Sequence, residues 1–206
     1  MPNKERRKRE KEELRQQILD VAKDIAATDG WQNVTIRKIC DKIHYTAPVV
    51  YQYFESKEMI LESLRLEGIM QVQLIFEKVD KKYSAPEKRL QEYALAWWHF
   101  AQQHPELYQV MYNLQGAICT GNGNNISTIV KHYSIAFSAI NQKAKRSEKF
   151  RLELCDHLIA IIHGFIALRM VNKIKSGNEN AEKAYKNSLQ RFIDSINDKK
   201  SKNDKR

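Results

Sequence analysis

The chain has 206 residues, of which 35 are Lys or Arg and 25 are Asp or Glu, so its net charge is +10. This excess suits a polyanionic partner without identifying one, and the length allows one small domain and one larger domain. Cys40, Cys119 and Cys155 lie far apart with no ligand-like spacing, which argues against a disulfide framework and against a zinc site.

Helices are predicted along almost the whole chain, because apolar residues recur at three- and four-residue steps and only seven glycines and four prolines interrupt them. We expect an all-α protein with about nine helices, at residues 10–29, 35–43, 46–53, 56–82, 84–103, 105–115, 126–145, 148–175 and 179–197. The glycines and asparagines of residues 116–125 predict a loop between two of these helices. The composition of residues 199–206 predicts a basic disordered tail.

Residues 35–60 contain two very short helices with a tight corner between them. Thr35 can cap the first helix, His44 lies at the corner, and Thr46 can cap the second helix, which has Pro48 in its first turn. Helices this short are not stable alone. Their spacing makes sense when they pack at a steep angle and present the second helix to a major groove. The segment therefore predicts a DNA-binding helix-turn-helix.

These landmarks resemble the N-terminal domain of the TetR family of bacterial transcription regulators. The resemblance covers residues 14–64 and rests on an apolar stripe in the leading helix and on Gly30-Trp31, Thr35, Ile39, Tyr51, Tyr53-Phe54 and Ser56-Lys57. His44 departs from the family, in which Gly is most frequent at the corner. Histidine tolerates a left-handed backbone better than most residues, so we expect the turn to survive. Beyond Leu64 the resemblance rests on helix order, although residues 105–112 and His163-Gly164 look like a subgroup with a Trp-His-Gly-type C-terminal domain.

The resemblance implies a division of the chain into two domains. Residues 1–57 would form the helix-turn-helix domain, and residues 58–198 a helical ligand-binding and dimerisation domain. Residues 1–9 are expected to be a flexible basic arm, which could reach DNA. Because their basic residues alternate with glutamates at helical spacing, a charged extension of the first helix is the alternative.

The function implied is that of a ligand-responsive, sequence-specific transcriptional regulator. Its partners would be double-stranded DNA with a pseudo-palindromic operator, a second copy of the chain in a homodimer, and a small-molecule effector. By the family's default it would be a repressor that the effector releases from its operator.

The predicted DNA contacts are Thr35, Arg37, Thr46, Ala47, Pro48, Val49, Tyr51, Tyr53 and Lys57. Arg37 matches a family position that can reach a base edge, and arginine is the best bidentate reader of guanine. Tyr51 and Tyr53 can place hydroxyls near phosphates, and Lys57 combines an ammonium with the free N–H groups of a helix start. The alternatives are a solvated side chain for Arg37 and a packing role for Tyr53.

Two sets of residues in the larger domain carry further predictions. Aromatic, thioether and imidazole side chains that can line a ligand pocket, or fill a core instead, are Tyr93, Trp97, Phe100, Tyr108, Met111, Tyr112, His132, His163 and Met170. In the family the last two helices form a four-helix dimer interface, which here implies Leu158, Ile162, Phe165, Tyr185, Leu189, Phe192 and Ile196.

No catalytic, cofactor or metal site is predicted, because the six histidines form no paired motif and no nucleophile and base converge in the sequence. The charged N-terminus is no secretory signal, and the apolar run 158–171 is too short to span a bilayer. We expect a cytoplasmic protein without membrane association. The alternative function is a basic helical interaction protein that binds a partner protein or an anionic surface without reading a DNA sequence.

Overall fold

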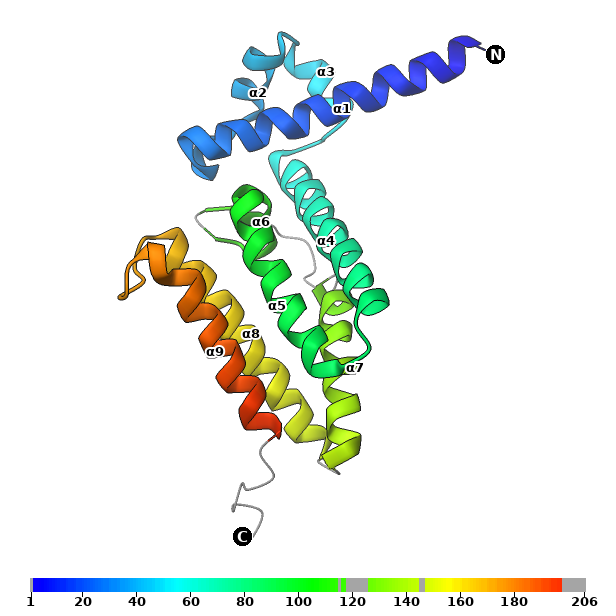
Figure 1. Ribbon diagram of the computed structural model, residues 1–206. Helices are drawn as coiled ribbons and strands as arrows, with labels where there is room; N and C mark the ends of the chain where they lie inside the picture. The colour runs from blue at the N-terminus through cyan, green and yellow to red at the C-terminus, as the bar shows by residue number, and fades with distance from the viewer. Residues whose placement is uncertain (1, 115, 118–125, 145–146, 198–206) are drawn as a thin grey trace. The chain divides into compact units, whose positions relative to one another are not determined.

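The computed structural model describes residues 2–114, 116–117, 126–144 and 147–197 (Figure 1). Every regular element in these ranges is helical, as the sequence predicts. The α-helices are α1 (Pro2–Asp29), α2 (Ile36–Ile43), α3 (Ala47–Tyr51), α4 (Lys57–Lys82), α5 (Pro86–Gln103), α6 (Pro105–Met111), α7 (Ile126–Ala144), α8 (Glu148–Met170) and α9 (Ala181–Asn197). Most of the predicted loop and the basic tail lie outside the described residues.

The chain divides into two compact units. The first comprises Met1–Gln71 and His104–Asn125, and the second comprises Val72–Gln103 and Ile126–Arg206. The division therefore falls inside α4 rather than at the expected boundary after residue 57, and α6 belongs to the first unit. Gly68 explains part of this grouping, because a Cβ there would lie 2.6 Å from the sulfur of Met111 in α6. A side chain at position 68 would therefore require the Met111 side chain to shift.

In the first unit, the short helices α2 and α3 are held by packing rather than by their own stability. The buried face of α1 meets Trp31, which is fully buried, and Ile39 of α2, Val50 of α3 and Phe54 complete the core. The Trp31 indole N–H donates a 2.9 Å hydrogen bond to Oε1 of Gln109 in α6. Trp31 is thus a fixed point to which both the helix-turn-helix and α6 attach.

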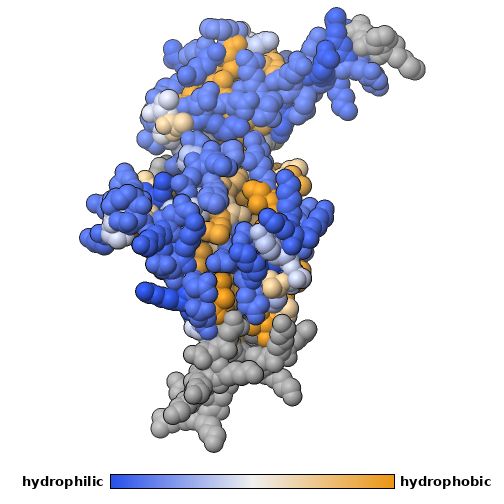
Figure 2. All heavy atoms as spheres, viewed as in Figure 1, coloured by the Kyte–Doolittle hydropathy of each residue, from blue (hydrophilic) through white to orange (hydrophobic). Residues whose placement is uncertain are grey.

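The N-terminal residues settle one of the two alternatives for the basic run. α1 begins at Pro2, so residues 2–9 are a helical extension and not an irregular arm. Ion pairs at i,i+4 spacing, Arg6 with Glu10 and Arg9 with Glu13, join successive turns of the extension. In the ribbon this part of α1 projects beyond α2 and α3, and its visible surface is hydrophilic (Figures 1 and 2).

Three helices end in the same left-handed cap, and none of them uses glycine. His44, Asn113 and Asn172 are the non-glycine residues with positive φ in the described chain, at 59°, 51° and 53°. Around each, the N–H of the following residue bonds to a carbonyl five positions earlier, from Tyr45 to Cys40, Leu114 to Gln109, and Lys173 to Leu168. These caps end α6 and α8 at Met111 and Met170, four and five residues before the ends predicted from glycines and prolines.

In the second unit, α5 packs against α7, α8 and α9 around an aromatic core. Trp97 and Tyr93 of α5 are fully buried and contact Phe76 of α4 at ring-centroid distances of 6.3 and 4.4 Å. The hydroxyl of Tyr185 in α9 donates a 2.6 Å hydrogen bond to the carbonyl of Ala94 in α5. In the described residues, no helix has a stretch sufficiently long and apolar to cross a bilayer.

Candidate nucleic-acid interface

The corner between α2 and α3 has the geometry of a helix-turn-helix. The hydroxyl of Thr35 accepts a 3.2 Å hydrogen bond from the N–H of Lys38 and so caps α2. His44 adopts the left-handed conformation that the sequence predicts at this corner. Thr46 precedes α3 in an extended conformation, and its side chain makes no cap hydrogen bond. The Thr46 hydroxyl therefore does not cap α3 and can form a hydrogen bond with a partner outside the helix.

α3 has one buried and one exposed side. Val50 is fully buried against the core of the first unit, whereas Thr46 and Pro48 are exposed and Tyr51 retains 51 % of its accessible surface. Ala47 and Val49 are partly exposed between them. Thr35 and Arg37 are exposed at the start of α2. The exposed side of α3 offers two hydroxyls and a run of small apolar groups, which suit phosphate oxygens and thymine methyl groups.

Lys57 has a partner that its sequence position did not reveal. Its Nζ donates a 2.8 Å hydrogen bond to the backbone carbonyl of Trp31. Burial lowers the pKa of Lys57, and the nearby Glu58 carboxylate opposes this only in part. An ammonium has three donors, so one bond to Trp31 leaves two for another acceptor. Lys57 therefore joins the start of α4 to the corner after α1 and still carries a positive charge to the surface.

Two features beside α3 were missed in the sequence. Tyr45, immediately before the Thr46 cap, is 46 % exposed and adds a third aromatic hydroxyl to this surface. Lys11 of α1 lies with its Nζ 5.8 Å from the centroid of the Tyr53 ring. No local pattern indicates either feature. The exposure of Tyr45 depends on the left-handed corner, and the contact of Lys11 depends on how α1 crosses the helix-turn-helix.

The comparisons with known proteins agree with this geometry. Residues 18–64 match the model of the family described as bacterial regulatory proteins, tetR family. The match identifies this N-terminal segment as similar to the DNA-binding domain of TetR-family regulators. The matched segment runs from the middle of α1 to the second turn of α4 and contains all the residues of the helix-turn-helix. Comparison with curated protein sequences gave no significant match.

Solved structures show the same fold over nearly the whole chain. A bacterial regulatory protein in the tetR family from Rhodococcus superposes with a TM-score of 0.70 at 14 % identity, covering 88 % of this chain and 96 % of that one. The TetR family transcriptional regulator PfmR from Thermus thermophilus gives 0.63 at 15 % identity, with 85 % and 93 % covered. A TetR variant from Acinetobacter baumannii in complex with minocycline gives 0.64 at 13 % identity, with 87 % and 94 % covered.

The family match over the helix-turn-helix and the shared fold support DNA-binding transcriptional regulation. The identities are too low to carry more than the fold to the second unit.

The predicted ligand-pocket residues are divided between the two units. Tyr108, Met111 and Tyr112 belong to the first unit, where burial raises the pKa of both tyrosines. The other six belong to the second unit. There Trp97, Tyr93 and Phe100 are at most 2 % exposed, so they fill a packed core in this structure rather than line an open chamber.

His132 and His163 have different surroundings within the second unit. His132 Nδ1 lies 2.7 Å from Oδ2 of Asp80, whose other oxygen accepts a hydrogen bond from the Tyr93 hydroxyl. Burial alone would raise the pKa of Asp80, but these two hydrogen bonds and the charge of His132 lower it. His163 contacts the Trp97 ring at a centroid distance of 5.4 Å, and burial lowers its pKa to about 4. His163 is therefore neutral at pH 7.

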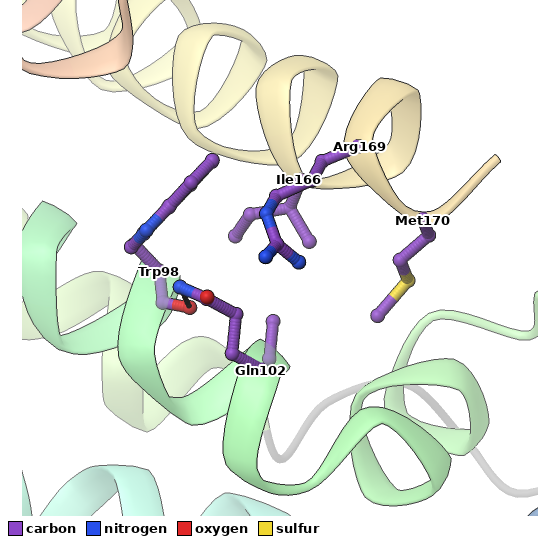
Figure 3. Close-up of a pocket in the computed structure, with 6 residues that line it drawn as sticks. Trp98, Gln102, Ile166, Arg169 and Met170 are labelled. Atoms are coloured by element: carbon purple, nitrogen blue, oxygen red, sulfur yellow. Dashed lines mark hydrogen bonds between the residues drawn. The ribbon is translucent and has the colours of Figure 1, made fainter. Parts of the chain in front are cut away.

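A small pocket lies between the C-terminal turns of α5 and α8 (Figure 3). It holds about 170 Å³ of space, part of it open to solvent, and contains Met170 from the predicted set. The guanidinium of Arg169 lies over the Trp98 ring, 5.5 Å from its centroid. The Gln102 amide, which donates to the carbonyl of Trp98 at 3.2 Å, lies beside it (Figure 3). The pocket is partly open to solvent, and Arg169 contributes a cationic group to its lining.

Most of the predicted dimer residues are already covered within the protomer. Those at most 3 % exposed are Leu158, Ile162, Tyr185, Leu189 and Ile196. Phe165 and Phe192 are partly exposed. The apolar faces on which the prediction rested thus pack into the second unit itself, and a dimer interface through these residues stays a prediction. The surface that α8 leaves open instead contains Ala160, Gly164 and Leu168.

Proposed function

We propose that this chain is a homodimeric repressor of the TetR family that reads a pseudo-palindromic operator through α3 and is released by a small molecule. The observation that carries the DNA-reading part is the exposed side of α3, next to a left-handed corner at His44 and opposite a fully buried Val50. A helix that packs against the core on one face and is exposed on the other can enter a major groove. The basic excess of the whole chain supports association with the phosphate backbone.

The proposed contacts fall into three classes. Arg37 reads a guanine edge, while Thr46, Ala47, Pro48 and Val49 meet base edges and thymine methyl groups. Phosphates are bound by the hydroxyls of Thr35, Tyr51 and Tyr53 and by the ammonium of Lys57. We add Tyr45 to the phosphate contacts because it is exposed and adjacent to the Thr46 cap.

Dimerisation is proposed through the open surface of α8. A Cβ added at Gly164 would meet nothing within 4 Å, and Ala160 one turn earlier is also exposed. Small residues at four-residue spacing let the backbone of a partner helix approach closely. Leu168, which is 47 % exposed, extends this surface with an apolar side chain. A two-fold contact here would pair two copies of α3 for an operator with two half-sites.

Release by a ligand is proposed through binding within the second unit. The minocycline complex of a TetR variant from Acinetobacter baumannii supports a ligand role for the fold. Because the aromatic core is filled in this structure, a ligand there must bind a different side-chain arrangement. If that arrangement is less competent for DNA, binding shifts the population away from the operator-bound state. A tenfold loss of operator affinity needs about 1.4 kcal/mol of differential binding.

The test of the proposed function is selection of random duplex DNA on the purified chain at physiological salt, followed by sequencing. We expect a pseudo-palindrome to be enriched and the Arg37→Ala variant to enrich a different sequence. Uniform binding that only weakens with salt would favour the basic helical interaction protein instead. Sedimentation at micromolar concentration checks the dimer, and a stable monomer would remove that part of the proposal. Cytoplasmic localisation is proposed with the function, because the operator is there.

A further inference from the structure

We propose that the N-terminal extension of α1 is a second DNA-binding element, a helical stripe of cations that contacts the phosphate backbone beside the operator half-site. It is a rigid continuation of the reading surface rather than a flexible arm. The inference rests on the proposed DNA-reading function but concerns a different element, which lies entirely outside the segment 18–64 matched by the family. The cations of the stripe are Lys4, Arg7, Lys8 and Lys11.

The helical geometry of α1 separates two kinds of cation that alternate in the sequence. With 3.6 residues per turn, the four stripe residues fall within an arc of about 100° that contains no acidic residue. Arg6 and Arg9 lie on the opposite side, paired with Glu10 at 3.3 Å and Glu13 at 3.5 Å. In the described chain no carboxylate lies within ion-pair distance of a stripe residue. All four are exposed, so their charges are available to an external anion.

The stripe continues onto the part of the first unit that follows α3. Lys11 lies over the Tyr53 ring, and one turn later the guanidinium of Arg15 lies 5.2 Å from the centroid of the Phe54 ring. Arg15 also donates a 3.2 Å hydrogen bond to the hydroxyl of Ser63 in α4. These contacts fix the rotation of α1 about its own axis. The four cations of the stripe therefore face the same side as Tyr53, which is a proposed phosphate contact. The paired arginines therefore face away from it.

The length and chemistry of the stripe fit a nucleic-acid backbone. At 1.5 Å per residue, Lys4 and Lys11 are about 10 Å apart along the helix, roughly the length of three phosphates on one strand. Long side chains on a helix adjust to phosphate spacing without reading bases, so the stripe adds affinity rather than sequence preference. The absence of apolar side chains from this surface argues against insertion into a lipid bilayer, which needs an apolar face.

Two double variants form a matched test. Arg7→Gln with Lys8→Gln removes two stripe charges, and Arg6→Gln with Arg9→Gln removes two paired charges. Both pairs are centred on the same point of α1 and change the net charge equally. Binding of the selected operator duplex is measured by fluorescence anisotropy across a series of salt concentrations. We expect the stripe variant to bind about tenfold more weakly near physiological salt, with a salt slope lower by about 0.9 for each phosphate that it no longer neutralises.

The control variant, Arg6→Gln with Arg9→Gln, should weaken operator binding by less than half the factor seen for the stripe variant. Equal losses of operator affinity in the two variants would mean that α1 acts only through its net charge. No loss in either variant would mean that α1 does not contact DNA. Either result overturns the inference. Helix content by circular dichroism checks that α1 survives in each variant. If the wild-type chain selects no operator, the proposed function fails first. A stripe variant that loses binding only to phosphatidylglycerol vesicles, with operator binding intact, would assign the stripe to lipid instead.

Discussion

The helix-turn-helix and the aromatic core of the second unit use their side chains in opposite ways. α3 has only five residues and buries one of them, so most of what it carries faces outward. α5 has eighteen residues and buries eight, including Trp97, Trp98 and Tyr93. The first region needs a rigid anchor beneath an exposed surface, whereas the second is a filled interior. A partner can meet α3 as it stands, but a ligand can enter the aromatic core only if side chains move.

The largest effect should come from opening the filled core. We expect Trp97→Ala to lower the free energy of unfolding by about 3–5 kcal/mol, because the indole is fully buried and its removal leaves a cavity. Urea unfolding followed by circular dichroism measures this, with the exposed His99 on the same helix, changed to Ala, as the control. A decrease below about 1 kcal/mol would show that α5 lines an open pocket in solution, and the contrast between the regions would disappear.

Acid should destabilise the core through His163. The unfolded side chain takes up a proton near pH 6.5, whereas burial keeps the folded group neutral until about pH 4. The unfolded state therefore binds more protons between these values, and the free energy of unfolding falls by about 3 kcal/mol as the pH drops through this window.

Unfolding midpoints of wild type and His163→Gln between pH 7 and pH 4.5 check this prediction. The variant should have the flatter profile, and His157→Gln, at an exposed position of the same helix, should follow the wild type. If His163→Gln keeps the full pH dependence, the enclosure of the His163 imidazole is not what destabilises the protein in acid.

At the DNA surface, Arg37→Ala should change sequence preference without changing stability. A bidentate arginine contributes about 1–3 kcal/mol of discrimination between bases, and the side chain is exposed and so makes little contribution to the core. Competition between the selected operator and single-base variants of it measures this discrimination. If the variant binds all sequences more weakly by the same factor, Arg37 contacts the phosphate backbone and does not read a base.

Lys57→Gln should weaken binding to all sequences and lower the salt slope by about one, the value expected when one phosphate is no longer neutralised. The substitution tests two roles at once, since Lys57 also bonds to the Trp31 carbonyl. Thermal unfolding separates them, because removing the bond to Trp31 would lower the melting temperature whereas removing a bond to phosphate would not. Unchanged DNA binding with lowered stability would assign Lys57 to the structure of the first unit alone.

The smallest effect is expected at the corner. His44→Gly should raise the free energy of unfolding by up to about 1 kcal/mol, because a side chain in the left-handed region carries a steric cost that glycine avoids. Sequence preference should not change, because the corner keeps its conformation. Chemical denaturation of the two proteins measures the difference, and destabilisation by glycine would mean that the imidazole stabilises the corner by more than the strain costs.

The two regions also differ in how far local sequence patterns could describe them. Thr35, Thr46 and Pro48 act within one helical turn of their own positions, so the start of each short helix was predictable. The boundaries of α6 and α8 were not, because Asn113 and Asn172 adopt a conformation for which glycine is the usual sign. Asparagine occurs in many other settings, and only the surrounding hydrogen bonds show that it ends a helix here.

The candidate site shows the same limit. Arg37 and Tyr51 were predicted as DNA-binding residues and are exposed, but the bond from Lys57 to Trp31 joins residues 26 positions apart and has no local signal. The dimer residues illustrate the converse problem. The apolar periodicity of α8 and α9 predicts burial correctly for Leu158 and Tyr185, but it cannot say whether the protomer or its partner provides the cover.

The sequence by itself determined that the chain is all-helical, where its helix-turn-helix lies and which family it resembles, because these properties follow from periodicity and from capping residues close together in the chain. Only the tertiary structure decided which faces are buried in the core. It placed the boundary of the compact units inside α4, filled the aromatic core, and turned the stripe from Lys4 to Lys11 toward Tyr53. These outcomes depend on the crossing of helices distant in sequence, and a one-dimensional pattern cannot specify the azimuth at which two helices meet.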